Sequence, residues 1–386
     1  MASRAKRKSE ARGAPLSDEV RARLCRPLAN AALRPEARGE AVLGVIVGGT
    51  PYRSISEGVG FCLDVLDLDD TDDTPSRIKL PFLPHGFSPH PRRPHIATSF
   101  EKRGPGAACV DLVEGALLDP IPPKPGHHFY GHGLYAAGGD VVFAVEMHLE
   151  TSAGVITVRD GETFRILDEF PSFGERPHDC MLLDEGRVLA ITNGGGRVGS
   201  KELGSLSFVS IADRRLLDKR EVPAGRLNAG HVAITDGGDL AVVSAPREGL
   251  AESDLGGVSL CGGDAKLTHM TNPSQLVRRL VGEALSVCVH EPSGHVVVTH
   301  PHAKLVTIWD LAHKRLVRTL EMDSPRGVTR TADDRFFVIS HGAEARLLLL
   351  DVQTLERAGV RGAGVAGGSH IYTWAPPTGR GAALPS

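Results

Sequence analysis

The most constraining feature of this sequence is a pattern of short hydrophobic runs that repeats about every 40–55 residues. In each repeat a head residue precedes a turn with Gly or Asp, a hydrophobic run, a loop, and a run that ends in Asp. Such runs, β-branched and bounded by Gly, Asp and Pro, are typical of strands, and helical periodicity is nearly absent after residue 40. The runs include Val42–Val47, Phe61–Leu68, Val141–Val145, Gly154–Val158, Val188–Thr192, Leu240–Ser244, Val296–Thr299, Leu305–Asp310, Phe336–Ser340 and Arg346–Asp351.

About four strands per repeat is the blade size of a β-propeller. We therefore predict an all-β, seven-bladed propeller over residues 41–375. The strand that His370 opens has no blade of its own, so we expect it to join the N-terminal strands over 42–82 and close the ring. Closure would remove the exposed edges of an open sheet. The seven predicted head residues are His85, His132, His178, His231, Ser286, Arg326 and His370.

Two end segments fall outside the repeat. Residues 1–40 are charged and Ala-rich, and Leu16–Leu33 predicts one helix with Ser17 as its N-cap. Residues 376–386 are expected to form an irregular tail. We treat both segments as appendages of the propeller.

Composition narrows the classes of function. The chain has 386 residues, 41% of them hydrophobic, and a net charge of −3, which argues against a general nucleic-acid or anionic-membrane binder. No run approaches 18 apolar residues, so no membrane-spanning helix is expected. The polar, basic N-terminus lacks the apolar stretch of a signal peptide, which predicts a cytoplasmic location. The six Cys are scattered, which indicates free thiols rather than disulfides or a thiolate zinc site.

The histidine heads carry the main chemical signal. In a propeller the start of each innermost strand lies at one mouth of the central channel, so these five side chains should converge there. The ends of the second strands return to the same mouth and are also polar or His-rich. These ends are Glu101, Glu146 with His148, Asn193, His300 with His302, and Ser340 with His341.

Converging imidazoles predict a metal centre. Neutral imidazole suits Cu, Fe, Zn and Ni, and the lack of a Cys/Met set argues against a soft Cu(I) site. We predict His132, His178, His231 and His370 as ligands, with His85 next, and copper or iron as the ion. Partners that orient the rings are expected at Asp179, Glu146 and Glu101. Arg326 and Glu146 are the candidate catalytic residues, with Arg326 placed to hold an anionic group near the metal.

A structural role for the same histidines is the competing interpretation. A residue repeated in every blade can bond a backbone carbonyl of its neighbour, as buried polar groups usually do. The heads Ser286 and Arg326 interrupt the histidines and leave a lopsided arc. That asymmetry favours a site with one open side over a repeated brace.

Four segments carry a family resemblance. The segments Gly126–Gly133, Glu175–Asp179 and Thr192–Gly195, with the His-Gly-Phe-x-Pro-His-Pro match at His85–Pro91, resemble a bacterial family of unknown function, DUF1513. The resemblance covers about residues 80–375 and implies a seven-bladed ring like that of quinoprotein amine dehydrogenase. It also implies His85, His128, His132 and His178 as motif positions, and a link to imelysin-type iron uptake.

The sequence departs from that pattern in three places. It lacks the export signal that family members often carry, which puts a periplasmic role in doubt. Leu227–Val232 replaces a Leu-x-x-Arg-His-Leu segment, and Thr299–Ala303 replaces a Ser-Pro-Arg-Gly-Gly segment. The second change adds His300 and His302 near the predicted mouth, which suggests a specialised member.

The sequence thus predicts a metal-binding propeller with a His-lined channel, and most specifically a Cu- or Fe-dependent oxidoreductase that acts on a small molecule or peptide. Two alternatives stay open. One is a non-catalytic propeller that holds a protein or peptide partner at the channel mouth, and the other is a metal carrier without turnover. No nucleic-acid or membrane partner is expected.

Overall fold

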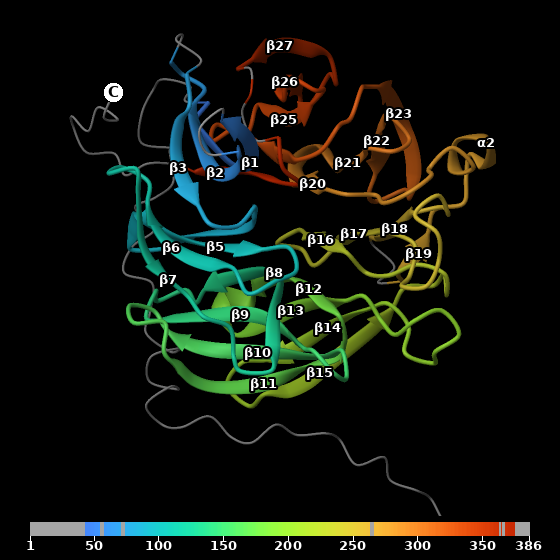
Figure 1. Ribbon diagram of the computed structural model, residues 1–386. Coiled ribbons are helices and arrows are strands. Elements are labelled where there is room, and N and C mark those ends of the chain that lie inside the picture. The colour runs from blue at the N-terminus through green and yellow to red at the C-terminus, as the bar shows by residue number, and fades with distance from the viewer. Residues whose placement is uncertain are drawn as a thin grey trace, which may run out of the picture.

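The computed structural model of the protein describes residues 43–54, 58–70, 74–262, 266–362, 364 and 367–374. Within these residues the chain forms seven four-stranded antiparallel sheets, which are the blades of a propeller (Figure 1). The predicted N-terminal extension with its helix, and the predicted C-terminal tail, lie outside the described residues.

The blades follow one another along the chain, each built from its innermost strand outwards. Blade 1 contains β28 (Ile371–Trp374), β1 (Val45–Ser54), β2 (Gly58–Asp67) and β3 (Ser76–Leu80); blade 2 contains β4 (Pro84–His90), β5 (Arg93–Glu101), β6 (Ala107–Asp111) and β7 (Ala116–Pro120); blade 3 contains β8 (His127–Tyr135), β9 (Val141–His148), β10 (Ala153–Asp160) and β11 (Ile166–Glu175). Blade 4 contains β12 (Pro177–Leu183), β13 (Val188–Asn193), β14 (Ser205–Ser210) and β15 (Arg215–Glu221); blade 5 contains β16 (His231–Ile234), β17 (Leu240–Ser244), β18 (Gly257–Cys261) and β19 (Thr268–His269). Blade 6 contains β20 (Val287–His290), β21 (His295–His300), β22 (Leu305–Asp310) and β23 (Arg315–Glu321); blade 7 contains β24 (Val328–Arg330), β25 (Phe336–His341), β26 (Arg346–Asp351) and β27 (Arg357–Arg361). The helices of the described part are short, namely η2 (Asp184–Gly186), α2 (Ser274–Val277) and η3 (Glu291–Ser293).

The ring closes as the sequence predicts. Strand β28 pairs antiparallel with β1, with Val45 opposite Trp374 and Gly48 opposite Ile371. The C-terminal strand therefore supplies the innermost position of the N-terminal blade (Figure 1). Successive first strands from β4 to β28 contact each other round the axis, so their starting residues gather at one place.

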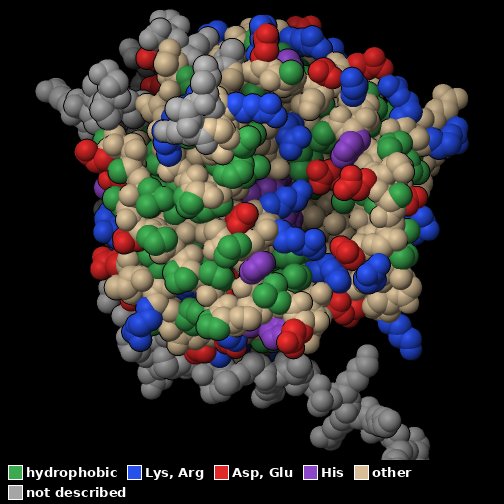
Figure 2. All heavy atoms as spheres, in the orientation of Figure 1, with side chains coloured by type: hydrophobic (Ala, Val, Ile, Leu, Met, Phe, Trp, Pro, Cys, Tyr) green, Lys and Arg blue, Asp and Glu red, His purple; other side chains and the backbone are tan. Residues whose placement is uncertain are grey.

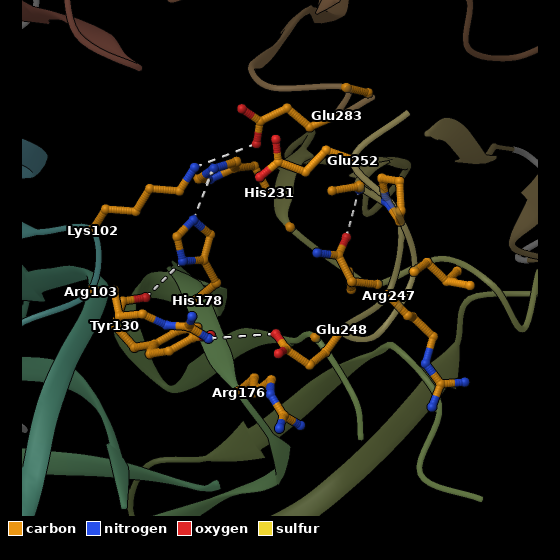
Figure 3. Close-up of a pocket in the computed structure, with 18 of the residues that line it drawn as sticks. Lys102, Arg103, Tyr130, Arg176, His178, His231, Arg247, Glu248, Glu252 and Glu283 are labelled. Atoms are coloured by element: carbon orange, nitrogen blue, oxygen red, sulfur yellow. Dashed lines mark hydrogen bonds and ion pairs between the residues drawn. The ribbon is translucent and has the colours of Figure 1, made fainter. Parts of the chain in front are cut away.

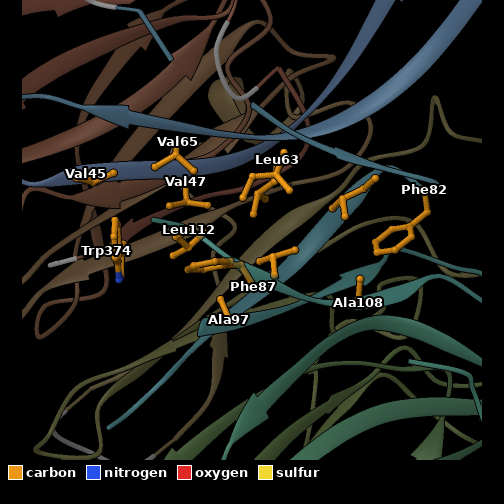
Figure 4. Close-up of a cluster of buried hydrophobic side chains, with 13 residues drawn as sticks. Val45, Val47, Leu63, Val65, Phe82, Phe87, Ala97, Ala108, Leu112 and Trp374 are labelled. Atoms are coloured by element: carbon orange, nitrogen blue, oxygen red, sulfur yellow. The ribbon is translucent and has the colours of Figure 1, made fainter. Parts of the chain in front are cut away.

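Apolar side chains between neighbouring blades form the core. Between blades 1 and 2, Val47 and Leu63 pack with Phe87, and Trp374 of the closing strand lies in the same cluster (Figure 4). These four side chains are at most 7% exposed. Each inter-blade layer thereby removes apolar surface from water on both of its faces, which is the main stabilising contribution to such a fold.

The aspartates at the ends of the third strands have a local structural reason. Oδ1 of Asp160 accepts hydrogen bonds from the amides of Glu162 and Thr163, and Oδ1 of Asp351 accepts from Gln353 and Thr354. An Asp carboxylate that binds the backbone two and three residues ahead stabilises a tight turn. The repeated Asp that marked blade ends in the sequence is therefore a turn residue and not part of a site.

Candidate metal centre

Five histidines converge at the axis, four of them from the start of a first strand and His132 from further along one. His85 lies in β4, His132 in β8, His178 in β12, His231 opens β16, and His370 directly precedes β28. Each exposes between 4% and 8% of its surface. Ring centroids of contacting pairs are 4.1–5.6 Å apart, from 4.1 Å for His231 and His370 to 5.6 Å for His132 and His370. The convergence that the sequence indicated is therefore present.

The nitrogen atoms lie at distances that suit a shared ion. One ring nitrogen from each of His85, His132, His231 and His370 lies within 4.8 Å of the other three. Nε2 of His178 is 3.2 Å from Nε2 of His85 and 3.2 Å from Nε2 of His231. Two nitrogens each bound at 2.0–2.1 Å to one tetrahedral ion are about 3.3 Å apart. The cluster could therefore hold a metal ion among these four or five rings.

The five rings come from two different positions in the blade, although the sequence pattern suggested one. Thr192 and Thr299 occupy equivalent positions in their blades. The Asp179 amide donates to Oγ1 of Thr192, and the Ser286 amide donates to Oγ1 of Thr299. Asp179 and Ser286 therefore occupy equivalent positions as well. Oγ1 of Thr192 donates to the Gly230 carbonyl, and Oγ1 of Thr299 donates to the Arg326 carbonyl, so Gly230 and Arg326 are equivalent. Because His231 follows Gly230, the position equivalent to His231 is one residue after Arg326. In this register His132, His231 and His370 share the position of Asp179, and His85 and His178 stand one residue earlier.

β-bulges explain how both positions reach the axis. The pairing of β4 with β5 shifts between Pro84 and Gly86, and that of β12 with β13 shifts between Pro177 and Cys180. A bulge inserts an extra residue and re-aims the neighbouring side chain. His85 and His178 lie in these bulges. A count of residues from the sequence does not show a bulge, so the two positions looked the same.

Close packing of the backbone also shapes the cluster. Gly131 has φ +123°, and a Cβ there would lie 2.6 Å from Cε1 of His178. Only glycine leaves room for the His178 ring beside the His132 segment. In blade 7 the position equivalent to His231 is Gly327. A Cβ on Gly327 would lie 2.5 Å from the Ile371 amide nitrogen. The His370 segment therefore occupies the space that a side chain from blade 7 would fill.

Polar partners outside the cluster orient the rings. The carboxylate of Asp179 lies between two of them, 3.6 Å from Nδ1 of His132 and 3.5 Å from Nδ1 of His231. Nδ1 of His178 is 2.7 Å from the Tyr130 carbonyl, which only accepts, so this nitrogen carries the proton. The Nε2 of neutral His178 is then a lone pair. Asp179 was one of three predicted orienting residues, and the structure places it in that position.

Two inward nitrogens have no partner within the described part of the chain. Nε2 of His132 and Nε2 of His370 are buried and make no hydrogen bond there. Nδ1 of His370 lies 3.2 Å from Oγ of Ser286 on the opposite side of its ring. A buried polar atom without a partner is uncommon in native proteins. A metal ion bound among the rings of His85, His132, His231 and His370 would supply a contact to both atoms.

Burial keeps the imidazoles neutral. Desolvation, followed by the neighbouring histidines, holds the pKa of His85, His178 and His370 well below the usual value. Burial lowers the pKa of His132 to about 4 despite the nearby Asp179 carboxylate. Burial alone would raise the pKa of Asp179, but His132, His231 and the Val232 amide together lower it. At neutral pH these four rings are thus uncharged, the form that binds metals.

The two predicted catalytic residues have other contacts. Nε of Arg326 donates to the Gly368 carbonyl at 2.6 Å. Glu146 is fully buried and forms an ion pair with Arg159 at 2.6 Å, and it also accepts from Thr157 and from the Lys124 amide. The described contacts of both residues lie within and between blades rather than on the histidine rings. Their catalytic role stays a prediction.

Residues at the position of Glu146 also make hydrogen bonds within their own blade in other blades. At the same place in other blades, His300 contacts Oγ1 of Thr307 at 2.9 Å and Asn193 donates to Oγ of Ser207 at 3.1 Å. The polar second-strand ends that the sequence assigned to the mouth are thus bonded to their own third strands in these three blades. Glu101, the third predicted orienting residue, accepts from the Gly106 amide in its own loop.

A cavity of about 620 Å³ adjoins the cluster. His178 and His231 form part of its wall (Figure 3). On the surface, histidine atoms lie in a hollow bordered by basic and acidic side chains (Figure 2). His302, which the sequence placed near the predicted mouth, also lines the cavity. Sequence reasoning missed the charged residues of the wall, although Lys102 and Arg103 directly follow Glu101 at a second-strand end that it had marked. The charged residues of the wall are Lys102, Arg103, Arg176, Arg247, Glu248, Glu252 and Glu283.

The comparison with family models decides the classification. The model described as "Protein of unknown function (DUF1513)" matches residues 78–372, which include all five axial histidines. The chain belongs to the DUF1513 family. No curated protein matches this DUF1513 chain.

Solved structures share the fold of this DUF1513 protein at low sequence identity. Hydrazine synthase of Kuenenia stuttgartiensis has a TM-score of 0.61 at 12% identity, over 77% of this chain and 93% of that chain. A protein from Lactobacillus plantarum has a TM-score of 0.58 at 13% identity, over 85% and 98% of the two chains. Dihydro-heme d1 dehydrogenase NirN, in complex with DHE, has a TM-score of 0.55 at 11% identity, over 92% and 80%. These likenesses establish the propeller fold.

Among the described residues, no helix has the length and apolar character needed to cross a membrane.

Proposed function

We propose that this protein binds one copper or iron ion at the axial histidines and uses it in redox chemistry on a small molecule or peptide. The observation that carries the proposal is the pair of buried, partnerless Nε2 atoms of His132 and His370, inside a group whose ring nitrogens lie within 4.8 Å. His85 and His231 complete this group of four. His178 would be a fifth ligand or would stand beside the ion.

The donor set supports a redox-active ion of intermediate softness. Neutral imidazoles suit Cu, Fe, Zn and Ni, and no thiolate or thioether belongs to the group of four. Asp179 and the Tyr130 carbonyl fix ring orientation from outside, as partners of metal-binding histidines usually do. A bound ion with an open coordination position would supply electron transfer or activation of a small molecule. The adjoining cavity gives a substrate access to His178 and His231.

Metal analysis tests the proposal directly. The protein, expressed without a His tag, is expected to carry about one equivalent of copper or iron, or to gain it on reconstitution. His132→Ala and His370→Ala should abolish stoichiometric binding because each removes one proposed ligand. Asp179→Asn should weaken binding about 10–100-fold because it removes the shared orienting carboxylate. Elemental analysis and titration of the metal-free protein measure these effects.

A surface histidine provides the matched control. The side chain of His313 is 72% exposed in a turn with Asp310, so His313→Ala should leave the metal content unchanged. A wild-type protein that stays metal-free after exposure to Cu(II) and Fe(II) would rule the proposal out and favour the non-catalytic binding propeller. Bound metal without oxygen consumption or substrate turnover would favour the metal carrier. The cytoplasmic location and the link to imelysin-type iron uptake stay predictions.

A further inference from the structure

The cavity beside the histidines has two walls of opposite charge. On one side lie Lys102 and Arg103 from the loop after β5, together with Arg176. On the other side lie Glu248 and Glu252 from the loop after β17, together with Glu283 (Figure 3). Arg247 of the same loop also lines the cavity, but it is 2% exposed and its guanidinium donates to the carbonyls of Gly196 and Gly225. The first wall comes from the loop between β5 and β6 of blade 2 and from the residue that joins blades 3 and 4. The second wall comes from the loop between β17 and β18 of blade 5 and from the segment that joins blades 5 and 6.

The two walls touch through weak ion pairs only. Nζ of Lys102 is 3.4 Å from Glu283, and Arg103 is 3.9 Å from Glu248. The lysine and arginine side chains are 50% and 53% exposed. Exposed ion pairs of this kind contribute little to stability, so a ligand that offers its own charges can replace them at small cost.

We propose that this cavity binds a small zwitterion, namely a free amino acid or a short peptide. Its carboxylate would bind the wall of Lys102, Arg103 and Arg176, and its ammonium group would bind the wall of Glu248, Glu252 and Glu283. A cavity of about 620 Å³ is within the usual size of small-molecule sites. A simple anion would leave the acidic wall unmatched, and a simple amine would leave the basic wall unmatched.

The lining between the charged walls suits a compact organic molecule. Ala229, Ala245, Pro246 and Ala284 offer small apolar surfaces, and the Tyr130 ring lies under Arg103, whose guanidinium carbon is 4.8 Å from the ring centroid. His178 and His231 reach the same space, so the ligand would lie next to the axial cluster (Figure 3). In this respect the inference deepens the proposed function, since it names the substrate class of that site and rests on it for any turnover.

Calorimetry with capped and uncapped peptides tests the binding itself. The probes are alanyl-alanine, its N-acetyl form and its C-terminal amide, added to the metal-depleted protein so that chelation of the ion by the peptide plays no part. The free dipeptide is expected to bind at least about tenfold more tightly than either capped form. Such a ratio corresponds to the loss of one charged contact.

Two variants assign the walls. Lys102→Ala should weaken binding of the free dipeptide and leave the affinity of the C-terminal amide unchanged. Glu252→Gln should weaken the free dipeptide and leave the N-acetyl form unchanged. Lys304→Ala is the matched control, because this exposed lysine pairs with Asp323 outside the cavity lining and should have no effect.

The outcomes separate this inference from the metal proposal. Equal binding of the free and capped peptides, binding of acetate alone, or no binding at millimolar concentration would overturn the zwitterion site. The metal content of the same preparations is measured in parallel. A normal metal content with no dipeptide binding would leave the metal proposal standing and reject only this inference.

Discussion

At the residue scale, the axial histidines are buried, and Nε2 of His132 and Nε2 of His370 have no hydrogen-bond partner within the described residues. Five imidazoles that are each at most 8% exposed stand in contact, and Asp179 is the carboxylate that lies beside two of them. Neutral rings tolerate such crowding because they carry no charge to repel each other. Protonation of any ring would place an unsolvated charge among its neighbours. The cluster is therefore stable only where it stays neutral or where an ion binds its lone pairs.

This neutrality predicts a pH-dependent stability of the metal-free protein. The folded state holds the pKa of His132 at about 4, whereas the unfolded chain takes up the proton near pH 6.5. The unfolded state therefore binds more protons between these values, and stability should fall as pH drops from about 6.5 towards 4. The loss should be on the order of a few kcal/mol for this ring. Urea unfolding of the metal-depleted protein across this range measures it.

A variant isolates the contribution of the ring from general acid denaturation. His132→Gln retains a polar side chain that does not titrate, so its stability should decline less steeply over the same pH range. Identical slopes for the two proteins would show that His132 is not held neutral in the folded state. Above about pH 7 the two slopes should coincide, because neither state then binds a proton at this position.

At the scale of the element, strand ends serve two purposes that look alike in sequence. The second-strand end of blade 3 carries Glu146, which the sequence assigned to the site, yet its carboxylate is bonded to Arg159 and Thr157 in the neighbouring strand. The first-strand starts of blades 2 and 4 carry His85 and His178, which bulges turn towards the axis. The alternation of side chains along a strand does not show whether such a residue binds within its own blade or faces the axis, because both arrangements depend on how the strands are paired.

The buried ion pair of blade 3 predicts a stability effect without a metal effect. Glu146→Ala would leave Arg159, whose side chain is 1% exposed, without its anionic partner. Loss of one partner of a buried pair typically costs about 3–5 kcal/mol. Thermal unfolding should show this loss, and the folded fraction should keep its metal content. Glu162→Ala, at a surface pair with Arg93 that is 3.5 Å long, should cost less than about 1 kcal/mol.

Glu146→Gln separates this structural role from the predicted catalytic one. Glutamine retains the hydrogen-bonding shape of the side chain but does not transfer protons at neutral pH. Full turnover by this variant would contradict a catalytic Glu146, and complete loss of turnover in a folded, metal-loaded protein would favour it.

At the scale of the whole molecule, ring closure connects stability to the site. Strand β28 completes blade 1, and the residue before it is His370, a member of the axial cluster. Trp374, at the other end of β28, is 2% exposed and packs between blades 1 and 2 (Figure 4). The packing of one aromatic side chain thus supports the placement of a proposed ligand.

Replacement of Trp374 tests this connection. Trp374→Ala should destabilise the protein by about 3–5 kcal/mol, because it empties a buried aromatic site next to the closing strand. Metal affinity should fall as well, since β28 positions His370. Trp374→Phe is the control and should cost clearly less than Trp374→Ala, because a ring still fills most of the site and Nε1 of Trp374 has no hydrogen-bond partner in the described structure to lose. Unfolding experiments and metal titrations on both variants measure these effects. An unchanged metal affinity in Trp374→Ala would show that the packing of the closing strand does not affect the metal site.

The order of residues specified the propeller architecture and which blades carry a histidine near the start of the first strand. Strand-length runs, turn aspartates such as Asp160 and Asp351, and the orphan strand after His370 reflect local preferences and edge pairing, which the order of residues specifies directly. Tertiary structure alone decided which neighbours these groups meet. Bulges brought His85 and His178 into the ring, register gave Glu146 to Arg159, and distant loops placed Lys102 opposite Glu283. Such contacts depend on how separate blades lie in space, and residue spacing along the chain does not contain that information.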